Sequence, residues 1–327
     1  MSAGTAELIA DRGEAAADAE FFRSRPFLDA EGATHTLRIV GGDTELLAPL
    51  LVRPIGDGPE LDAISPYGYP GLAPSRRVCV SSRHAEQNTS SAEGGGIDPA
   101  KIDFGPTGLV SLFLRHRLGP PPLTGAKERN IVQIADPALA PKSRPSDRRQ
   151  VRRNLEAGYE AMLVPGSETT PAQRAAFLNL YEQTMRRAAA AAHYFFPAAY
   201  FDRVLEADST WLALAIAPGG EPAAASIAAV SDGFLHYYLS GSADSHLRDS
   251  PMKNVVATLI EHSAELNLPL NLGGGISPRD ALEEFKRGFA NRQEPWQTSE
   301  IICNEKKYKL LSEGHPSTPF FPAYRAQ

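Results

Sequence analysis

Residues 234–289 decide the fold, and they read FLHYYLSGSADSHLRDSPMKNVVATLIEHSAELNLPLNLGGGISPRDALEEFKRGF. The opening FLHYYLS has the aromatic and apolar content of a strand. After a polar loop, Ser250 predicts the start of a helix, because serine often caps helix N-termini. Residues 269–274 then predict a short buried strand, and residues 280–289 a second helix. The expected caps of that second helix are Ser277, Pro278 and Asp280.

Two further strands precede this stretch, at 211–217 (WLALAIA) and 223–231 (AAASIAAVS). The dipeptide Asp232-Gly233 predicts a tight turn into the strand at 234–240, so we expect an antiparallel meander. A final strand is predicted at residues 298–304 (TSEIICN).

Two helices are predicted upstream of the meander, at 146–158 and 170–188. The first is highly charged, with Ser146 as its expected N-cap and Gly158 just past its last helical residue. The second begins TPAQ, in which Thr170 and Gln173 have the spacing of a capping box. The helix at 170–188 is therefore the best-defined helix in the sequence.

The first half of the chain is richer in strands. Residues 34–40, 45–55 and 130–136 combine apolar and β-branched residues with flanking turn formers. Residues 105–119 predict a helix closed by a glycine, and the polar, glycine-rich residues 81–101 a surface excursion. A Pro-rich break at 140–146 predicts the boundary between a first domain, 1–145, and a second, 146–327.

This order of elements is typical of a GNAT acyltransferase core. Residues 181–201 (YEQTMRRAAAAAHYFFPAAYF), 236–256 and 270–289 resemble the C-terminal module of Fem-like GNAT proteins. The loop SPYGYPG at 65–71 resembles part of their first module. The resemblance implies an α+β fold of two GNAT-like modules, each a mixed, mostly antiparallel sheet flanked by helices. The Gln/Arg-x-x-Gly-x-Gly/Ala loop that binds the coenzyme A pyrophosphate in ordinary GNAT enzymes is absent before Ser250.

Composition narrows the classes of function. The net charge of −6 argues against generic nucleic-acid binding, although a local basic stripe remains open. Two cysteines give no disulfide framework, and the histidines and cysteines lack metal-ligand spacing, so we expect neither metal nor cofactor. No signal peptide or apolar run of about 20 residues is evident, which predicts a cytoplasmic protein.

The resemblance implies that Lys286 stabilises the oxyanion of amide formation and that the Phe285 backbone carbonyl holds the incoming amine. A preorganised cation at a developing oxyanion is the main requirement of such chemistry. The alternative for Lys286 is an ordinary surface lysine on a helix.

The expected donor side is the start of the helix after Ser250, where free N–H groups suit a phosphate. Ser250 either acts there or serves as a helix cap, and the aromatic strand before it lines the donor cleft or the core. The candidate donor-binding residues are Tyr238, Ser240, Ser250, Lys253 and Asn254.

Candidate acceptor-binding residues come from two places. Tyr67 and Tyr69 lie in the SPYGYPG loop, which either holds an acceptor or simply packs. Arg186 and Tyr194 follow the helix at 170–188, where an arginine could pair with an acceptor carboxylate or with a surface partner. Asp62, Asp103 and Asp244 are candidate general bases, but none is assigned.

These residues lead to three hypotheses. The first is an aminoacyl-tRNA-dependent transferase that adds an amino acid to the free amine of a peptide-like acceptor, a cell-wall precursor or a peptide natural product. Its tRNA contacts would be Arg148, Arg149, Arg152 and Arg153. The second is an acyl-CoA-dependent N-acyltransferase of the same fold, and the third a non-catalytic GNAT-like binding module.

Overall fold

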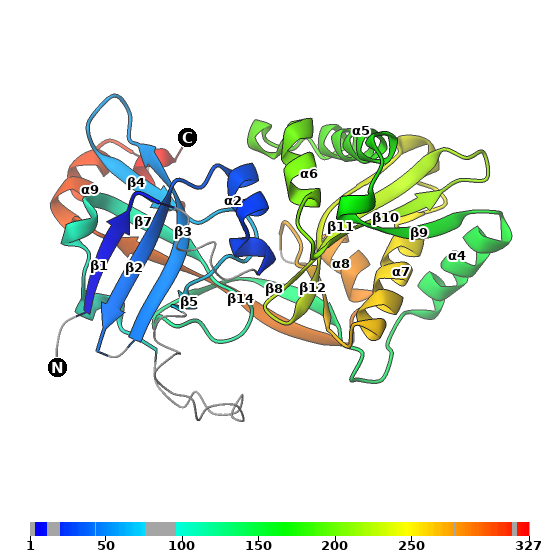
Figure 1. Ribbon diagram of the computed structural model, residues 1–327, viewed down its shortest axis with the longest axis horizontal. Helices are drawn as coiled ribbons and strands as arrows, with labels where there is room; N and C mark the ends of the chain where they lie inside the picture. The colour runs from blue at the N-terminus through cyan, green and yellow to red at the C-terminus, as the bar shows by residue number, and fades with distance from the viewer. Residues whose placement is uncertain are drawn as a thin grey trace. The chain divides into compact units, whose positions relative to one another are not determined.

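The computed structural model describes residues 4–11, 20–42, 44–75, 96–277, 279–315 and 319–326. Pro278, an expected helix cap, and most of the surface excursion expected at 81–101 lie outside these residues. The chain forms two compact units, one of residues 1–129 and 296–327, the other of residues 130–295. Figure 1 gives the labels of the helices and strands of both units.

The first unit is built on a sheet in the order β6-β1-β2-β3-β4-β7-β14. Most neighbours are antiparallel, whereas β1 with β6 and β4 with β7 are parallel. Its elements are β1 (Gly4–Ile9), α2 (Arg25–Glu31), β2 (His35–Gly41), β3 (Thr44–Pro54), β4 (Leu61–Ile64), β5 (Ala73–Pro74), β6 (Ile102–Asp103), β7 (Leu109–Arg115), β14 (Arg292–Ile302) and α9 (Glu305–Ser312).

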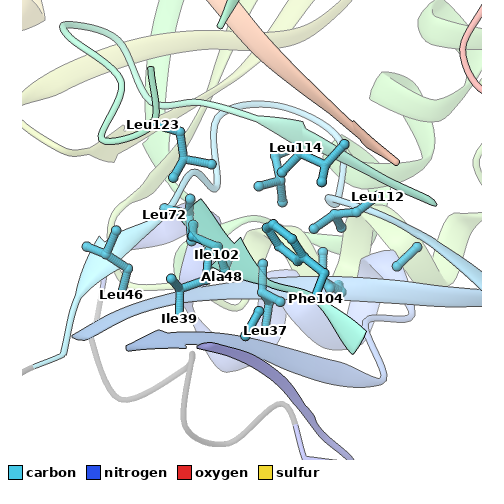
Figure 2. Close-up of a cluster of buried hydrophobic side chains, with 14 of the residues drawn as sticks. Leu37, Ile39, Leu46, Ala48, Leu72, Ile102, Phe104, Leu112, Leu114 and Leu123 are labelled. Atoms are coloured by element: carbon cyan, nitrogen blue, oxygen red, sulfur yellow. The ribbon is translucent and has the colours of Figure 1, made fainter. Parts of the chain in front are cut away.

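The core of this unit is formed by the apolar faces of its strands. Figure 2 shows Leu37 and Ile39 of β2 in one buried cluster with Phe104 and with Leu112 of β7. Alternation of buried and less buried residues along β2 explains this arrangement, because successive side chains of a strand point to opposite faces. The strands expected at 34–40 and 45–55 are thus confirmed.

The helix expected at 105–119 is wrong, because this segment contains the strand β7. A 3-10 turn over Gly105–Thr107 ends at Gly108, whose φ of 70° stops it before the strand begins. β7 then lies between β4 and β14, and most of its residues are buried. A short apolar run of this kind fits a central strand as well as a helix.

The second unit has a sheet in the order β8-β13-β12-β11-β10-β9, in which only β12 with β13 is parallel. Figure 1 shows α5 and α6 over one side of this sheet and α7 over the other. Its elements are β8 (Lys127–Ala135), α4 (Pro145–Glu156), β9 (Glu160–Pro165), α5 (Pro171–Arg187), α6 (Ala198–Leu205), β10 (Thr210–Ile216), β11 (Pro222–Ser231), β12 (Phe234–Ser242), α7 (Met252–Glu265), β13 (Leu270–Gly273) and α8 (Ala281–Arg287).

Local sequence signals account for much of this unit. Thr170 and Gln173 form the predicted capping box at the start of α5. Asp232 and Gly233 have φ values of 49° and 78°, the left-handed values that a tight hairpin between β11 and β12 requires. The predicted meander and the helix at 170–188 are confirmed.

Two predicted helix caps are wrong. The N-cap of α4 is Arg144 rather than Ser146, because Pro145 occupies the first turn. The N-cap of α7 is Pro251, without a side-chain cap, and Ser250 before it has a φ of 51°. The Ser250 hydroxyl donates to the Leu247 carbonyl at 3.4 Å instead.

The site of interest lies where β12 and β13 diverge. Their parallel ladder pairs Leu235 with Leu270 and His236 with Asn271, and it ends there. On its other edge β12 carries a bulge, since Ile227 of β11 lies opposite Leu239 and Ala228 opposite Tyr237. Successive side chains of a strand point to opposite faces, so the neighbouring Tyr237 and Tyr238 of β12 face opposite sides of the sheet.

The compact units differ from the predicted ranges 1–145 and 146–327. The chain passes between the units within β8 and again within β14. Residues 296–327 belong with the first unit because β14 pairs antiparallel with β7 from Thr298 to Ile302.

Candidate functional site

Lys286 is buried at the diverging strands of the second unit. Its side chain leaves α8 and donates from Nζ to the carbonyl oxygen of Gly274 at 2.7 Å. Only 8% of the residue is exposed. Burial lowers the pKa of the ammonium to about 8, although the Asp280 carboxylate opposes the shift. The hypothesis that Lys286 is an ordinary surface lysine is therefore wrong.

Tyr237, from the aromatic strand that was expected to line the donor cleft or the core, forms a second wall. Its ring centre lies 5.9 Å from Lys286 Nζ, within the range of a cation–π contact. Its hydroxyl donates to Ser240 Oγ at 2.6 Å, and burial raises its pKa to about 12. The sequence shows the pair Tyr237-Tyr238, and alternation along β12 places the two rings on opposite faces. Packing of Tyr237 with the cluster that includes Phe285 decides that Tyr237 faces Lys286.

The loop that holds Lys286 is itself anchored. Asn130 Nδ2 donates to the carbonyl of Gly275 at 2.6 Å. The Asp280 carboxylate accepts from the N–H groups of Ile276, Ser277 and Glu283 at 2.7 to 2.9 Å. Burial would raise the pKa of Asp280, but these hydrogen bonds hold it below its ordinary value. The predicted cap at Asp280 is confirmed, and it fixes the loop that Lys286 contacts.

Phe285, the neighbour of Lys286 on α8, makes contacts through its ring and through its carbonyl group. The ring packs with Phe289 at a centroid distance of 5.6 Å. The carbonyl oxygen accepts from the Gly288 N–H at 3.1 Å as α8 ends. A carbonyl oxygen can accept two hydrogen bonds, so this contact leaves capacity for an incoming amine.

The start of α7 is more closed than the sequence suggested. The N–H groups of Lys253 and Asn254 donate to the carbonyls of Ser250 and Pro251 at 3.0 Å. Lys253 Nζ forms an ion pair with Asp147 of α4 at 2.9 Å. The buried Asn254 accepts from Asn154 of α4 at 2.7 Å. These contacts join α7 to α4, so Asn254 has a structural role in this state.

Tyr238 and Ser240, the other candidate donor-binding residues, both make contacts within the unit. The hydroxyl of Tyr238 lies 2.6 Å from that of Tyr200 on α6. Ser240 receives the hydrogen bond from Tyr237. Ser240 therefore lies with the Lys286 site through Tyr237, whereas Tyr238 belongs to the α6 side of the sheet.

The candidate tRNA-contact residues form one face of α4. Their spacing of one and four residues places them together on the helix surface. The opposite face makes polar contacts with α7, including Asp147 with Lys253. All four candidates are exposed: Arg148, Arg149, Arg152 and Arg153.

Tyr67 and Tyr69 lie in a well-supported loop of the first unit. The Tyr67 N–H donates to Glu31 at 2.7 Å. The Tyr69 ring lies 5.5 Å from that of Phe22 and 5.7 Å from that of Trp296. Both tyrosines are half-buried. The Tyr69 ring therefore packs against other aromatic rings of its own unit.

Arg186 and Tyr194 lie at the surface of the second unit. Arg186 pairs with Glu182 of the same helix at 2.6 Å, and its side chain is 63% exposed. Tyr194 is exposed as well, and its ring lies 4.1 Å from that of His193. Arg186 belongs to α5 and Tyr194 to the 3-10 turn after it, whereas Lys286 belongs to α8.

The three aspartates considered as bases have other partners. Asp62 is buried and accepts from Arg53 at 2.9 Å and from Arg325 at 2.6 Å. Asp103 accepts from the Gly105 N–H, and Asp244 pairs with Arg187. All three stabilise local structure.

Metal clusters and membrane-spanning helices are both absent from the described part of the chain. Across those ranges, no group of three or more His, Cys, Asp or Glu side chains is arranged to hold a metal ion. Within the same ranges, every helix is too short or too polar to cross a membrane.

Comparisons with known proteins identify the fold. Residues 141–287 match the family model described as acetyltransferase (GNAT) domain. The crystal structure of FemX is similar to 93% of this chain and 99% of its own, with 11% identity and a TM-score of 0.60. A conserved protein of unknown function from Bacteroides thetaiotaomicron covers 89% of this chain and 93% of its own, with 12% identity and a TM-score of 0.50. The comparison with curated proteins gave no match. Residues 141–287 thus form a GNAT-type domain, and the chain has a Fem-like fold.

Proposed function

We propose that this protein forms amide bonds by moving an amino acid from aminoacyl-tRNA to the free amine of a peptide-like acceptor. The acceptor class is a cell-wall precursor or a peptide natural product. The observation that carries the proposal is the buried ammonium of Lys286, held by the Gly274 carbonyl beside the ring of Tyr237. A surface lysine would have no reason to lose its hydration in this way.

The chemistry asks little of the protein beyond a positioned cation. The amine nitrogen attacks the ester carbonyl carbon, and the C=O electron pair moves to oxygen beside Lys286. The pair then returns, the bond from carbon to the tRNA ribose oxygen breaks, and the proton lost by the amine ends on that oxygen. Charge on the carbonyl oxygen exists only along this path, so Lys286 would stabilise the transition state more than the bound donor.

Two features support tRNA as the donor. The exposed arginines of α4 present positive charge that could meet phosphates. In addition, the N–H groups of Lys253 and Asn254 at the start of α7 already donate to backbone carbonyls. A coenzyme A pyrophosphate would need such groups to be free.

The second candidate function is acyl-CoA-dependent N-acylation. The match of residues 141–287 to a family model described as an acetyltransferase domain favours it. Lys286 would have the same role in this reaction, because a thioester carbonyl passes through a similar oxyanion.

The Lys286→Met variant tests the proposed role with either donor. Methionine keeps the length and apolar stem of lysine and a similar helix propensity, so α8 should stay folded. We expect kcat to fall roughly 10²- to 10³-fold, the usual effect of losing one oxyanion donor, while the Kd of the donor changes far less.

The matched control is Lys309→Met on α9, an exposed lysine of the first unit. It should leave kcat and the melting temperature unchanged. Near-normal turnover of Lys286→Met would remove the oxyanion role. A parallel loss of donor binding and turnover would make Lys286 a substrate anchor.

A further inference from the structure

A buried glutamine next to the Lys286 loop has hydrogen-bonding capacity that the protein does not use. Gln133 of β8 is fully buried. Its Oε1 accepts from Gln293 Nε2 at 2.9 Å. Its own Nε2, with two N–H groups to donate, has no hydrogen-bond partner among the described residues.

The pairing of β8 with β13 places Gln133 at the site. Gln133 lies directly opposite Gly273, the residue before the one whose carbonyl holds Lys286. β8 has no extra residue here, since the irregularity falls on β13 between Asn271 and Gly273. Gln133 therefore shares a face with Ala135 two positions later.

That face is the one on which α8 packs. Ala135 belongs to the same buried apolar cluster as Phe289, which follows α8, and as Leu270 and Leu272 of β13. Phe285 and Tyr237 pack against this cluster. Gln133 is thus a polar residue of β8 that lies beside this apolar cluster, at the point where β8 pairs with the start of the Lys286 loop.

We infer that the Gln133 side-chain amide is a second hydrogen-bond donor to the carbonyl oxygen of the transferred acyl group, opposite Lys286. The inference rests on the proposed acyl transfer and holds for a tRNA ester or a thioester. The amine nitrogen bonds to the carbonyl carbon as the C=O pair moves to oxygen. The Gln133 N–H and the Lys286 ammonium then both stabilise the negative charge on this oxygen. When the electron pair returns to re-form the C=O bond, the ester or thioester bond breaks. The leaving oxygen or sulfur takes the proton that the amine has lost.

The Gln133 Nε2 group is buried without a hydrogen-bond partner among the described residues, and this favours a role in the reaction over a purely structural role. An unpaired buried amide lowers stability, whereas an apolar side chain of equal size would pack there without that penalty. The partner that Gln133 does have, Gln293, is itself exposed. A neutral donor also suits a site that already contains a buried cation, since it adds no further charge.

The test is Gln133→Met, which keeps the length of glutamine and removes the amide. We expect kcat to fall roughly 10²-fold with the better acyl donor, with little change in donor Kd. The melting temperature of the free protein should stay equal or rise, because an unpaired buried polar group is removed.

The matched control is Gln173→Met in the capping box of α5. It should show the opposite pattern, a lower melting temperature with unchanged kcat. A melting temperature for Gln133→Met that falls as far as that of Gln173→Met would make the amide structural and overturn the inference. Unchanged turnover would overturn it as well.

A second variant, Gln133→Glu, separates donation from acceptance. Glutamate keeps an acceptor but loses the N–H donors, so kcat should fall at least as far as in Gln133→Met. Activity near that of the wild type would show that the position accepts a hydrogen bond instead. If Lys286→Met loses turnover and Gln133→Met does not, the inference about Gln133 is wrong and the proposed function stands. If the wild type transfers no acyl group from either donor, the proposed function fails, and the melting temperatures still decide whether the amide is structural.

Discussion

At the scale of single residues, the burial of Lys286 links stability to chemistry. Its pKa is lowered from 10.5 to about 8, so the folded state holds this proton less tightly than the unfolded chain. The unfolded state binds more protons between these two values, and this lysine therefore makes the protein more stable as pH rises through that window. Below about pH 8 the fold carries a buried charge that opposes folding. A role in function explains why such a residue is kept.

The same titration predicts the pH dependence of activity. Only the charged lysine stabilises an oxyanion, so kcat should decline as pH rises, with an apparent pKa of about 8. Lys286→Arg stays charged far above this pH, and any residual activity it has should lack the alkaline decline. The measurement is the single-turnover rate from about pH 6.5 to about pH 10 for both proteins, a range that brackets the lowered and the ordinary lysine pKa. A wild-type rate that keeps rising to the alkaline end of that range would contradict the role.

Sequence reasoning identified Lys286 and Phe285 through the resemblance to Fem-like proteins, and the strand of Tyr237 and Ser240 as a border of the cleft, but it did not identify Gln133. Gln133 reaches the site through the pairing of β8 with β13, and Tyr237 of β12 through the contact of its ring with Lys286 of α8. These are contacts between residues far apart in the chain, and no local pattern encodes them. The hydrogen bond between Asn254 and Asn154 is another such contact, because Asn154 lies on another helix.

At the scale of secondary-structure elements, sequence analysis correctly predicted caps and turns that depend only on residues close together in the chain. The capping box of α5 and the Asp232-Gly233 turn each depend on residues a few positions apart. β7 was mistaken for a helix because a short, almost wholly apolar run has no distinctive period. Its identity depends on having β4 and β14 as neighbours.

The cap of α5 gives a prediction of stability. Thr170→Ala removes the side-chain acceptor for the Gln173 N–H, which lies 3.2 Å from the hydroxyl oxygen. We expect the free energy of unfolding to fall by about 1 kcal/mol in urea titrations, since capping threonines typically contribute this much. Turnover should be unaffected. An unchanged urea midpoint would show that packing of Phe177 and Tyr181 alone holds the helix.

The exposed face of α4 gives a prediction for the donor. Arg149→Gln with Arg153→Gln should raise the KM for charged tRNA. It should also reduce the log–log slope of binding against salt by roughly 0.7 to 0.9 for each phosphate that the protein no longer neutralises. The matched control is Lys306→Gln with Lys309→Gln on α9, which removes as much exposed charge from the first unit. Equal effects of the two double variants would mean that net charge matters and that α4 does not.

At the scale of the whole molecule, the class of fold was predictable and the course of the chain was not. The resemblance of residues 181–201, 236–256 and 270–289 to Fem-like proteins implied the α+β, Fem-like fold, and the comparisons confirm it. The Pro-rich break at 140–146 precedes α4, but the compact units separate within β8 and β14. A strand such as β14, which begins in one unit and ends in the other, leaves no mark in composition.

The identity of the acyl donor also belongs to this scale, because only an assay of the complete protein can determine it. The most direct measurement incubates the full chain with total tRNA charged with labelled amino acids and a panel of peptide amines, with and without RNase, beside a parallel series with acyl-CoA. We expect label in an amide product that RNase abolishes and that Lys286→Met reduces. Product formed from acyl-CoA and indifferent to RNase would contradict tRNA dependence in favour of coenzyme A, and no amide product from either donor would contradict acyl transfer itself.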